Sequence, residues 1–542
     1  MKYPIGIQSF EKIRREGFVY VDKTDLVYKM VQGHIYFLAR PRRFGKSLLV
    51  STLKAYFEGR KDLFEGLKMM ELETEWNKYP VISFDFNGIN KNIPNSLRDY
   101  LNQVIRETEA KYHLPCFDTE DTTLRFRTLI PRLHEATGQQ VVVLIDEYDK
   151  PLLDLLETGN PDDEKQLASN RELLKAFFSI FKATDDHLRF VLLTGITKFS
   201  QITMFSGFNQ PDDISLSNRY DTLLGITEEE LHTVFAESIA ELADTLGKNE
   251  KEAKELLKKR YDGYHFSERM IDVYNPFSIL NTFAELKMKD YWFTSGTPTY
   301  LVRLLGHSQE DIMTYTSGEH SIDEFLNYKA DVAKPLPMIF QAGYLTVKGY
   351  DPEFEMYQLD FPNNEVRQGV ITLLANDYLQ LNEQAASWTQ RIVRAMREGD
   401  LELVRKLFTA FLAETPYSMR PKKDQKDREL YFHYTFYLLM RLISCYTVYT
   451  EKQLSEGRAD CIVETSKFIY IFEFKLDGTA DEALKQIKER AYARAYDADA
   501  RPLYQIGASF SSKTGTIEEW KSETLKKPTP DPSLGRGVGI ES

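Results

Sequence analysis

The sequence predicts an α/β fold whose first part is a doubly wound parallel sheet, and three observations support this. Apolar runs of strand length alternate with helical stretches, an order typical of parallel strands joined by crossover helices. One run, 141–145, is continuously apolar, as in a strand buried on both faces. Polar residues end two of the runs, at the sheet edge where ligands bind. The predicted strands lie at 34–39, 80–86, 141–145 and 188–195.

A basic loop joins the first predicted strand to a helix. It reads Arg40-Pro41-Arg42-Arg43-Phe44-Gly45-Lys46-Ser47, and the apolar spacing of 48–57 is helical. A strand, a loop ending in Gly-Lys-Ser and a helix form the context of a phosphate-binding loop, because N–H groups at the helix start attract anions. We expect Lys46 to reach the outer phosphates of a nucleotide and Ser47 to hold Mg²⁺. The expected nucleotide-binding residues of the loop are Arg42, Arg43, Phe44, Gly45, Lys46 and Ser47.

Arg40 occupies the place of the first glycine in the general GxxxxGK[ST] pattern. Glycine normally supplies backbone freedom there, so the opening turn of the loop needs another explanation. The alternative is a basic strand–helix corner that binds no nucleotide.

The third predicted strand ends in Asp146 and Glu147. We expect Asp146 to contact Mg²⁺ and Glu147 to polarise the attacking water. A strand that ends in a solvated acidic turn is the alternative. Together with the basic loop, these carboxylates predict binding of ATP or GTP, and we take ATP as the cofactor.

The fourth predicted strand ends in Thr194. In P-loop ATPases of the additional-strand type, a strand between the two Walker strands ends in a polar sensor of the γ-phosphate. Thr194 fits that place, with Thr197 and Lys198 as runners-up, and a hydroxyl that caps the next turn is an equally good interpretation. Arg219 is a candidate trans-acting arginine finger, although any surface arginine would qualify.

Composition limits the class of protein. A chain of 542 residues predicts two to four domains, and no apolar run approaches the length of a membrane span. The N-terminus lacks a signal-peptide layout, and the three cysteines form no metal-spaced cluster, so we expect a cytoplasmic protein. The net charge of −13 means that nucleic acid must be bound through local basic patches. The two candidate patches are Arg40, Arg42 and Arg43, and Arg420, Lys422, Lys423, Lys426 and Arg428.

The middle of the chain is predicted to be helical and then to form a hairpin. Thr227 and Glu230 form a capping-box pattern at the start of what could be a helical lid. The segments 343–348 and 354–359 flank a turn, which gives a winged-helix-like layout. Such a wing either contacts DNA or packs against the protein.

A second chemical site is predicted near the end of the chain. Segments 457–464 and 467–475 pattern as antiparallel strands, and alternation places Glu473 and Lys475 on one face, where Asp460 can join them. Two carboxylates suit Mg²⁺, and Lys475 would orient water or neutralise developing charge. Glu429, on a predicted helix 427–440, could add a third carboxylate, with Glu451 as a fallback. An exposed hairpin with alternating charges is the alternative.

A predicted helix at 481–496 follows this hairpin. Its basic side chains could follow a phosphate backbone. The last residues, 516–542, lack an apolar period and are expected to be a disordered tail.

The chain resembles the bacterial family of AAA-ATPase-like proteins joined to a C-terminal PD-(D/E)XK nuclease-superfamily domain. Arg40 in the loop is usual in that family. The resemblance implies a restriction-endonuclease-like α/β domain in which Asp460, Glu473 and Lys475 are the metal and catalytic residues. The residues that carry it are Pro4-Ile5-Gly6, Tyr20-Val21-Asp22-Lys23-Thr24, Arg40 to Ser47, Asp146-Glu147-Tyr148-Asp149, Thr194-Gly195, Gly457-Arg458-Ala459-Asp460, Glu473-Phe474-Lys475 and Gln486-Ile487.

These observations lead to one functional expectation and one rival. We expect an ATPase domain at 1–225, a helical lid and winged-helix-like region at 226–400, and a nuclease-like domain at 401–515. The protein would hydrolyse ATP and cleave DNA with Mg²⁺, could form a homo-oligomer, and would act in defence or mobile-element biology. The rival is a nucleotide-dependent switch or scaffold whose nuclease fold is inactive.

Overall fold

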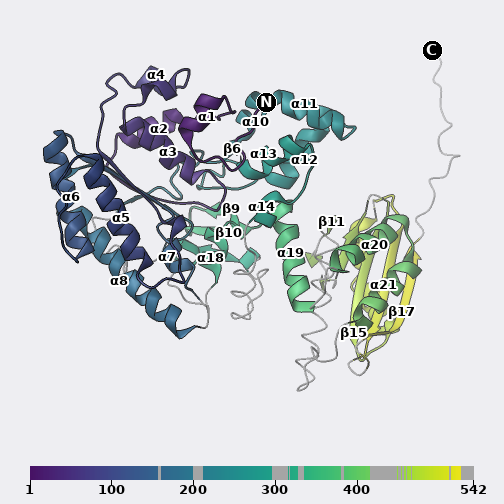
Figure 1. Ribbon diagram of the computed structural model, residues 1–542. Helices are drawn as coiled ribbons and strands as arrows, with labels where there is room; N and C mark the ends of the chain where they lie inside the picture. Colours follow the sequence, from purple (N-terminus) through teal and green to yellow (C-terminus); the bar gives the residue numbers. More distant parts are fainter. Residues whose placement is uncertain are drawn as a thin grey trace, which may run out of the picture. The chain divides into compact units, whose positions relative to one another are not determined.

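The structure is a computed structural model, and it divides into two compact units, Met1–Arg367 and Gln368–Ser542. We describe each unit by itself (Figure 1). The domain boundaries expected from the sequence at 225, 400 and 515 stay predictions. The residues described are 1–156, 160–198, 211–295, 315–316, 318–326, 335–379, 384–414, 448–449, 453–454, 457–458, 461–465, 467–497, 499–511, 514 and 516–525.

The first unit is built around a parallel sheet of strand order β2-β3-β4-β1-β5. β4 lies between β1 and β3, so Leu38 pairs with Thr194 and Ile145 with Leu193. This order confirms the predicted parallel fold and brings the carboxyl ends of β1, β3 and β4 to one edge. The strands are β1 (Ile35–Ala39), β2 (Val81–Asp85), β3 (Val141–Asp146), β4 (Leu188–Gly195) and β5 (Asp212–Asp213).

Helices pack around this sheet because their apolar faces need cover. Figure 1 shows α1, α2 and α3 grouped together, and α5, α6 and α8 grouped together. The second group is joined to the sheet by aromatic side chains: the rings of Phe126 and Phe177 stack at 4.3 Å, and both meet Phe84 edge-on. The helices are α1 (Phe10–Glu16), α2 (Thr24–Val31), α3 (Lys46–Phe57), α5 (Ser96–Lys111), α6 (Thr122–Thr137) and α8 (Pro161–Ala183).

Helices also follow the sheet, as the sequence predicts. Thr227 caps α10, and both hydrogen bonds of the capping box with Glu230 are present. The N-terminal segment covers their shared core, since Tyr3, Val19 and Val21 pack against it. The helices are α10 (Glu228–Val234), α11 (Ala236–Thr245), α12 (Glu250–Tyr261), α13 (Pro276–Glu285) and α14 (Tyr291–Ser295).

The predicted hairpin is present in the first unit. β9 (Thr346–Asp351) pairs antiparallel with β10 (Met356–Asp360), and β8 (Glu319–Ser321) adds a third strand. Two short helices, α17 (Ile322–Leu326) and α18 (Leu336–Gln341), lie beside it in sequence. The turn of the hairpin exposes 68% of Phe354 between Glu353 and Glu355. An acidic tip repels phosphates, so it disfavours a contact of this hairpin with a DNA backbone.

The second unit contains a mixed sheet of order β11-β14-β15-β16-β17. β14 and β15 are antiparallel, as predicted, while β15 and β16 are parallel. Alternation sends Phe472 and Phe474 toward α20 and α21, and Ile471 toward α23. The elements are α19 (Asn364–Leu379), which spans the division between the units, α20 (Gln384–Glu398), α21 (Leu401–Glu414), β11 (Val448–Tyr449), β14 (Cys461–Glu464), β15 (Ile469–Leu476), α23 (Ala480–Glu489), β16 (Leu503–Phe510) and β17 (Ile517–Leu525).

The last strand corrects one prediction. Residues 517–525, expected to begin a disordered tail, form β17, which pairs antiparallel with β16 along its length. The residues of β17 are mostly exposed and four of the nine are charged, so the segment has no apolar run of its own. Pairing with a buried neighbour, which a single-segment pattern does not reveal, makes it a strand. The rest of the predicted tail lies outside the described residues.

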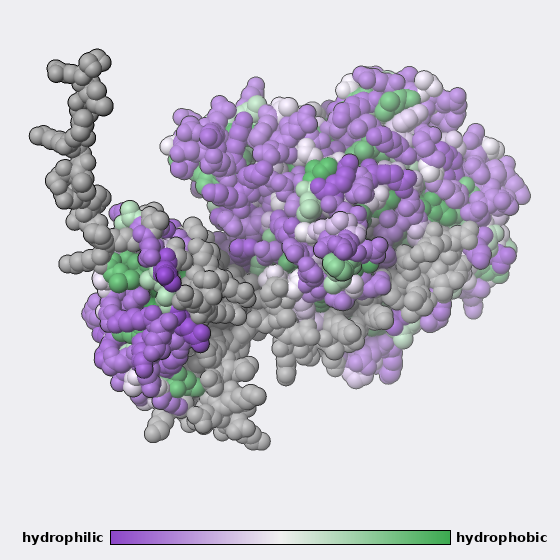
Figure 2. Space-filling model, turned by 180° about the vertical axis from the view of Figure 1, so that it is seen from behind, coloured by the Kyte–Doolittle hydropathy of each residue, from purple (hydrophilic) through white to green (hydrophobic). Residues whose placement is uncertain are grey.

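The surface is mostly polar. Figure 2 shows hydrophilic residues over most of the described face, with small separated apolar patches. No helix in the described part of the chain is both long enough and apolar enough to cross a bilayer.

Candidate functional site

The basic loop wraps around the start of α3. Gly45 adopts a left-handed conformation (φ 99°), which turns the chain from the loop into the helix. Lys46 is 5% exposed, and its ammonium donates hydrogen bonds to the carbonyls of Arg40 (2.9 Å) and Pro41 (3.1 Å). The half-buried Ser47 follows it in the first turn. The loop therefore encloses a cation at a helix N-terminus, an arrangement suited to phosphate.

The carboxyl ends of β3 and β4 meet beside this cation. Thr194 donates a 2.6 Å hydrogen bond to Oδ1 of Asp146, which also accepts the Glu147 N–H at 3.0 Å. Both Asp146 and Thr194 are buried. The predicted sensor and the predicted metal ligand are thus direct neighbours, although their roles stay predictions.

Charge and burial act against each other at this edge. Burial lowers the pKa of Lys46, while the carboxylates of Glu147, Asp146 and Asp149 raise it. Burial raises the pKa of Glu147, and Lys46 partly offsets this. The basic and acidic motifs, which are about 100 residues apart in sequence, therefore interact electrostatically in the fold. A carboxylate with a raised pKa is a better general base than an ordinary glutamate.

Asp149 is a residue that the site prediction missed. It is buried, and its Oδ2 accepts hydrogen bonds from the N–H of Ile196 (2.9 Å), the N–H of Thr197 (2.6 Å) and the hydroxyl of Thr197 (2.8 Å). It therefore holds the turn after β4 against the turn after β3. Thr197, a runner-up sensor, is occupied by this contact. The only sign of Asp149 in the sequence was its place in the segment Asp146-Glu147-Tyr148-Asp149, which is part of the family resemblance.

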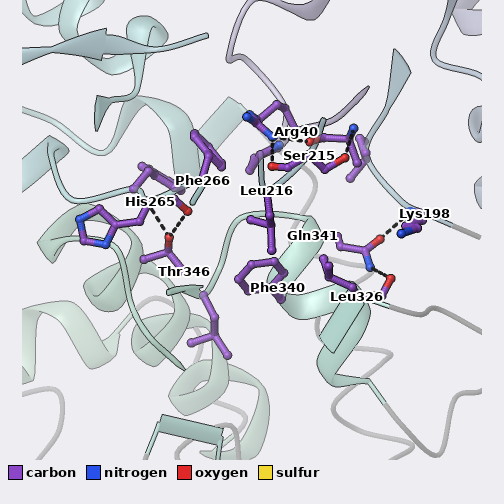
Figure 3. Close-up of a pocket in the computed structure, with 15 residues that line it drawn as sticks. Arg40, Lys198, Ser215, Leu216, His265, Phe266, Leu326, Phe340, Gln341 and Thr346 are labelled. Atoms are coloured by element: carbon purple, nitrogen blue, oxygen red, sulfur yellow. Dashed lines mark hydrogen bonds between the residues drawn. The ribbon is translucent and has the colours of Figure 1, made fainter. Parts of the chain in front are cut away.

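Lys198, the other runner-up, is also engaged. Its ammonium lies 2.6 Å from Oδ2 of Asp213, and its N–H donates to Oε1 of Gln341 at 2.6 Å. The Gln341 amide in turn donates to the carbonyl of Leu326 at 2.6 Å (Figure 3). The candidate finger Arg219 is exposed and paired with Asp212 at 2.7 Å.

The arginines and the phenylalanine of the loop face different surroundings. Arg42 and Arg43 are exposed, and the Arg43 guanidinium lies 5.0 Å from the ring of Phe277. Phe44 is buried edge-on against Tyr264 and Phe266, so only its backbone is left for a nucleotide. Arg40 is buried as well, and burial lowers its pKa to about 9.

The second candidate site lies on β15 and α23. Glu473 is 1% exposed, and its Oε1 accepts a hydrogen bond from the Gln486 amide. Lys475 donates to Oε1 of Gln486 at 2.5 Å and lies 3.5 Å from Oε1 of Glu473. The structure thus brings Glu473 and Lys475 together, on one strand face as predicted. Gln486, which the resemblance named but the predicted site did not include, joins them.

Several predicted ligands lie outside the described residues. Asp460, Glu429 and Glu451 belong to this group, as does the basic patch 420–428. The neighbouring pair Cys461 and Phe472 is described and is antiparallel. Within the described ranges, no group of three or more His, Cys, Asp or Glu side chains is placed to hold a metal.

The basic helix near this site is partly neutralised. Lys485 pairs with Glu489 at 3.6 Å, and Lys488 pairs with Glu523 at 2.8 Å. These exposed pairs are weak and exchange readily for other partners.

Two family models support the predicted combination of domains. The family model described as "Predicted AAA-ATPase" matches residues 4–205, and the one described as "PD-(D/E)XK nuclease superfamily" matches residues 427–520. "Uncharacterized protein in vnfD 5'region" from Azotobacter chroococcum mcd 1 is 34% identical over 97% of this chain and 99% of its own length. The crystal structure of Cdc6p from Pyrobaculum aerophilum aligns with 80% of this chain and 90% of its own, at 11% identity and a TM-score of 0.26. The chain belongs to the family of AAA-ATPase-like proteins that carry a C-terminal PD-(D/E)XK nuclease-superfamily domain.

Proposed function

We propose that the protein binds and hydrolyses ATP in its first unit and cleaves DNA with Mg²⁺ in its second. The observation that supports the first activity best is the buried group of Lys46, Asp146 and Thr194, in which the Asp146–Thr194 hydrogen bond is 2.6 Å long. The second activity is supported by the cluster of Glu473, Lys475 and Gln486.

The residues of the first site fit a nucleotide and its metal. Lys46 supplies a buried cation at a helix N-terminus, and the oxygens of Ser47 and Asp146 are hard ligands suited to Mg²⁺. When bound, ATP supplies a phosphoanhydride bond that can be hydrolysed. Glu147, whose pKa burial raises, would take a proton from the attacking water. Thr194 fixes the position of the Asp146 carboxylate.

The residues of the second site fit a hydrolytic metal centre. Glu473 offers carboxylate oxygens, and Asp460 and Glu429 are the further ligands that the sequence suggests. When bound, Mg²⁺ supplies a water of lowered pKa and stabilises negative charge on phosphate. Gln486 orients the Glu473 carboxylate and the Lys475 ammonium at the same time, because its amide donates to one and accepts from the other. Lys475 would then neutralise charge that develops on the phosphate.

We further propose that ATP binding gates cleavage, because both sites belong to one chain. Such a pairing suits a role in defence or in mobile-element biology, in the cytoplasm and as a homo-oligomer. DNA would approach through local basic patches, since the net charge of −13 repels it overall.

A cleavage assay tests the nuclease half. The full chain is incubated with single- and double-stranded DNA and with RNA, with Mg²⁺ or Mn²⁺, in the presence and absence of ATP. The double variant Asp460→Ala, Lys475→Ala is expected to lose roughly a hundredfold or more of the cleavage rate. Lys467→Ala is the matched control, because Lys467 is exposed and lies just before the first residue of β15, at the end of the strand opposite to Lys475.

The same assay distinguishes the rival function. Equal background cleavage by the wild type and the double variant on every substrate would show a switch or scaffold with an inactive nuclease fold. Cleavage of RNA alone would support the proposed nuclease activity and exclude DNA as its substrate.

A further inference from the structure

Arg40 stands between the sensor strand and the lysine of the phosphate loop. Its N–H donates to the carbonyl of Gly195 at 3.1 Å, which extends the β1–β4 pairing by one residue. Its own carbonyl accepts the Lys46 ammonium at 2.9 Å. The placement of the Arg40 backbone therefore determines where the Lys46 ammonium is held.

The side chain of Arg40 lines a pocket together with Ser215 and Phe266 (Figure 3). Arg40 is 1% exposed, and its guanidinium donates to two carbonyls of the segment 215–220, that of Ser215 and, at 3.4 Å, that of Tyr220, as well as to that of Ala39 at 3.1 Å. It also lies 4.1 Å from the centre of the Phe266 ring. A planar guanidinium can reach two carbonyls and stack on a ring at once, whereas an ammonium cannot.

No carboxylate in the described part of the chain forms an ion pair with Arg40. Asp213 and Asp221 act on it at longer range. Each of these already has a cation of its own: Asp213 pairs with Lys198 at 2.6 Å and Asp221 with Arg269 at 2.8 Å. A buried charge held by carbonyls is costly and is poorly explained by ion-pair stability. The contacts of the Arg40 side chain, which link three segments of the chain, explain better why an arginine is buried here.

We propose that Arg40 is a positioning residue for ATP hydrolysis, whose side chain fastens the carbonyl that holds Lys46 to the segment 215–220 and to Phe266. This inference rests on the ATPase function proposed above. In the general loop pattern, glycine allows the opening turn because its backbone is unrestricted. In this protein the anchored side chain of Arg40 holds the turn in place instead. Restoring that glycine should damage the site and not improve it.

The inference predicts a separation of binding from turnover. The start of α3 has other supports, because Phe44 is packed against Tyr264 and Phe266. The N–H groups that attract phosphate therefore stay in place when the Arg40 side chain changes. The orientation of Lys46 relative to Asp146 and Glu147, in contrast, changes with the Arg40 side chain. Small errors in the alignment of reacting groups lower a reaction rate strongly.

The test uses Arg40→Lys and Arg40→Gly in the full chain, with Arg189→Lys as the matched control. Arg189 also donates to two carbonyls, of Val31 (2.7 Å) and Gly33 (3.2 Å), and lies near a ring, that of Tyr79, but at the opposite end of β4. For Arg40→Lys we expect kcat for ATP to fall roughly tenfold while the ATP dissociation constant stays within about threefold. Arg40→Gly should lose more, and Arg189→Lys should change neither constant by more than about twofold.

The outcomes separate the two levels of the proposal. A wild-type protein that does not bind or hydrolyse ATP would refute the proposed function and this inference with it. Normal wild-type turnover, with Arg40→Lys no worse than Arg189→Lys, would overturn the inference alone. The inference would also be overturned if kcat and affinity fell together. Arg40→Lys keeps the charge and most of the side-chain volume, so it carries the test if Arg40→Gly does not fold.

Discussion

Asp262, at the end of α12, carries a carboxylate that the protein buries. It is 2% exposed, and neither oxygen accepts a hydrogen bond of normal geometry from the described residues. Burial, followed by the charge of Asp272, raises its pKa to about 7; Glu228 also raises this pKa, while Lys258 lowers it. The phenol of Tyr274 lies in the same electrostatic group. The carboxyl of Asp262 should therefore titrate near neutral pH.

This carboxylate predicts a pH-dependent stability. Its pKa in the unfolded chain is about 3.9, so between about pH 4 and 7 the folded protein holds a proton that the unfolded chain lacks. The stabilising effect is complete below about pH 4 and is lost as the pH rises through 7. The free energy of unfolding should fall by up to about 1.4 kcal/mol per pH unit in that window.

The measurement is the urea unfolding midpoint of the intact chain at pH 5, 6, 7 and 8. Asp262→Asn should flatten the decline because it removes the titrating group. Asp244→Asn, an exposed change on the neighbouring helix α11, should leave the decline intact. Identical pH profiles for the wild type and Asp262→Asn would show that this carboxylate does not titrate in the window.

Sequence reasoning located residues that stand at strand ends and missed those that act through contacts. Asp146 and Thr194 were predictable because parallel strands end at one edge, and they lie within hydrogen-bond distance. Glu473 and Lys475 were predictable from strand alternation. The resemblance named Gln486, but its contact role was not predictable, because this role depends on how α23 packs over β15 and no periodicity within one element encodes that packing.

At the scale of elements, the phosphate loop is covered by segments far from it in sequence. The Trp292 indole donates to the carbonyl of Arg42 at 3.0 Å, and Arg40 and Phe44 pack against Phe266. Gly343, which follows α18 and precedes β9, approaches Pro41 so closely that an added Cβ would lie 2.6 Å from Pro41 Cβ. Segments between α12 and β9 therefore fix the outer side of the loop.

This close approach predicts that Gly343→Ala disturbs the phosphate loop. Gly343 has a φ of 91°, so alanine adds left-handed strain as well as the clash with Pro41. We expect a loss of about 3 kcal/mol of stability, since strain and overpacking add. ATP affinity should fall as well, because the clash moves Pro41 and with it the backbone of the loop that is proposed to bind phosphate.

Gly138→Ala is the control that isolates backbone strain. Gly138 ends α6 with a φ of 66°, and nothing lies within 4 Å of its would-be Cβ. It should cost only about 1 kcal/mol and leave ATP affinity unchanged. Equal effects of the two substitutions on stability and affinity would argue against a rigid contact between Gly343 and the loop.

Prediction was also uneven among the elements. The buried strand β3 was visible because every position in it is apolar until Asp146. The hairpin β9–β10 was visible from its turn. β17 was not, because its charged residues satisfy no pattern by themselves and the neighbouring β16 provides its hydrogen bonds. Edge strands of this kind depend on tertiary context more than on propensity.

Considered as a whole molecule, the chain has two compact units, and one site is proposed in each. Each proposed site depends on side chains from its own unit. The first gathers an enclosed cation and carboxylates at a sheet edge, and the second gathers a carboxylate, a lysine and an amide at the end of a strand. We therefore expect a change at one site to leave the local geometry of the other intact.

The ATPase proposal requires that a loop with arginine in place of its first glycine still binds a nucleotide. Titration of ATP into the full chain with Mg²⁺, followed by calorimetry, tests it most directly. Lys46→Ala should abolish binding, whereas Lys54→Ala, an exposed change on the same helix, should bind ATP as the wild type does. Binding by Lys46→Ala that equals that of the wild type, or a wild type that gives no binding heat at any temperature, would show that this loop is not a nucleotide site.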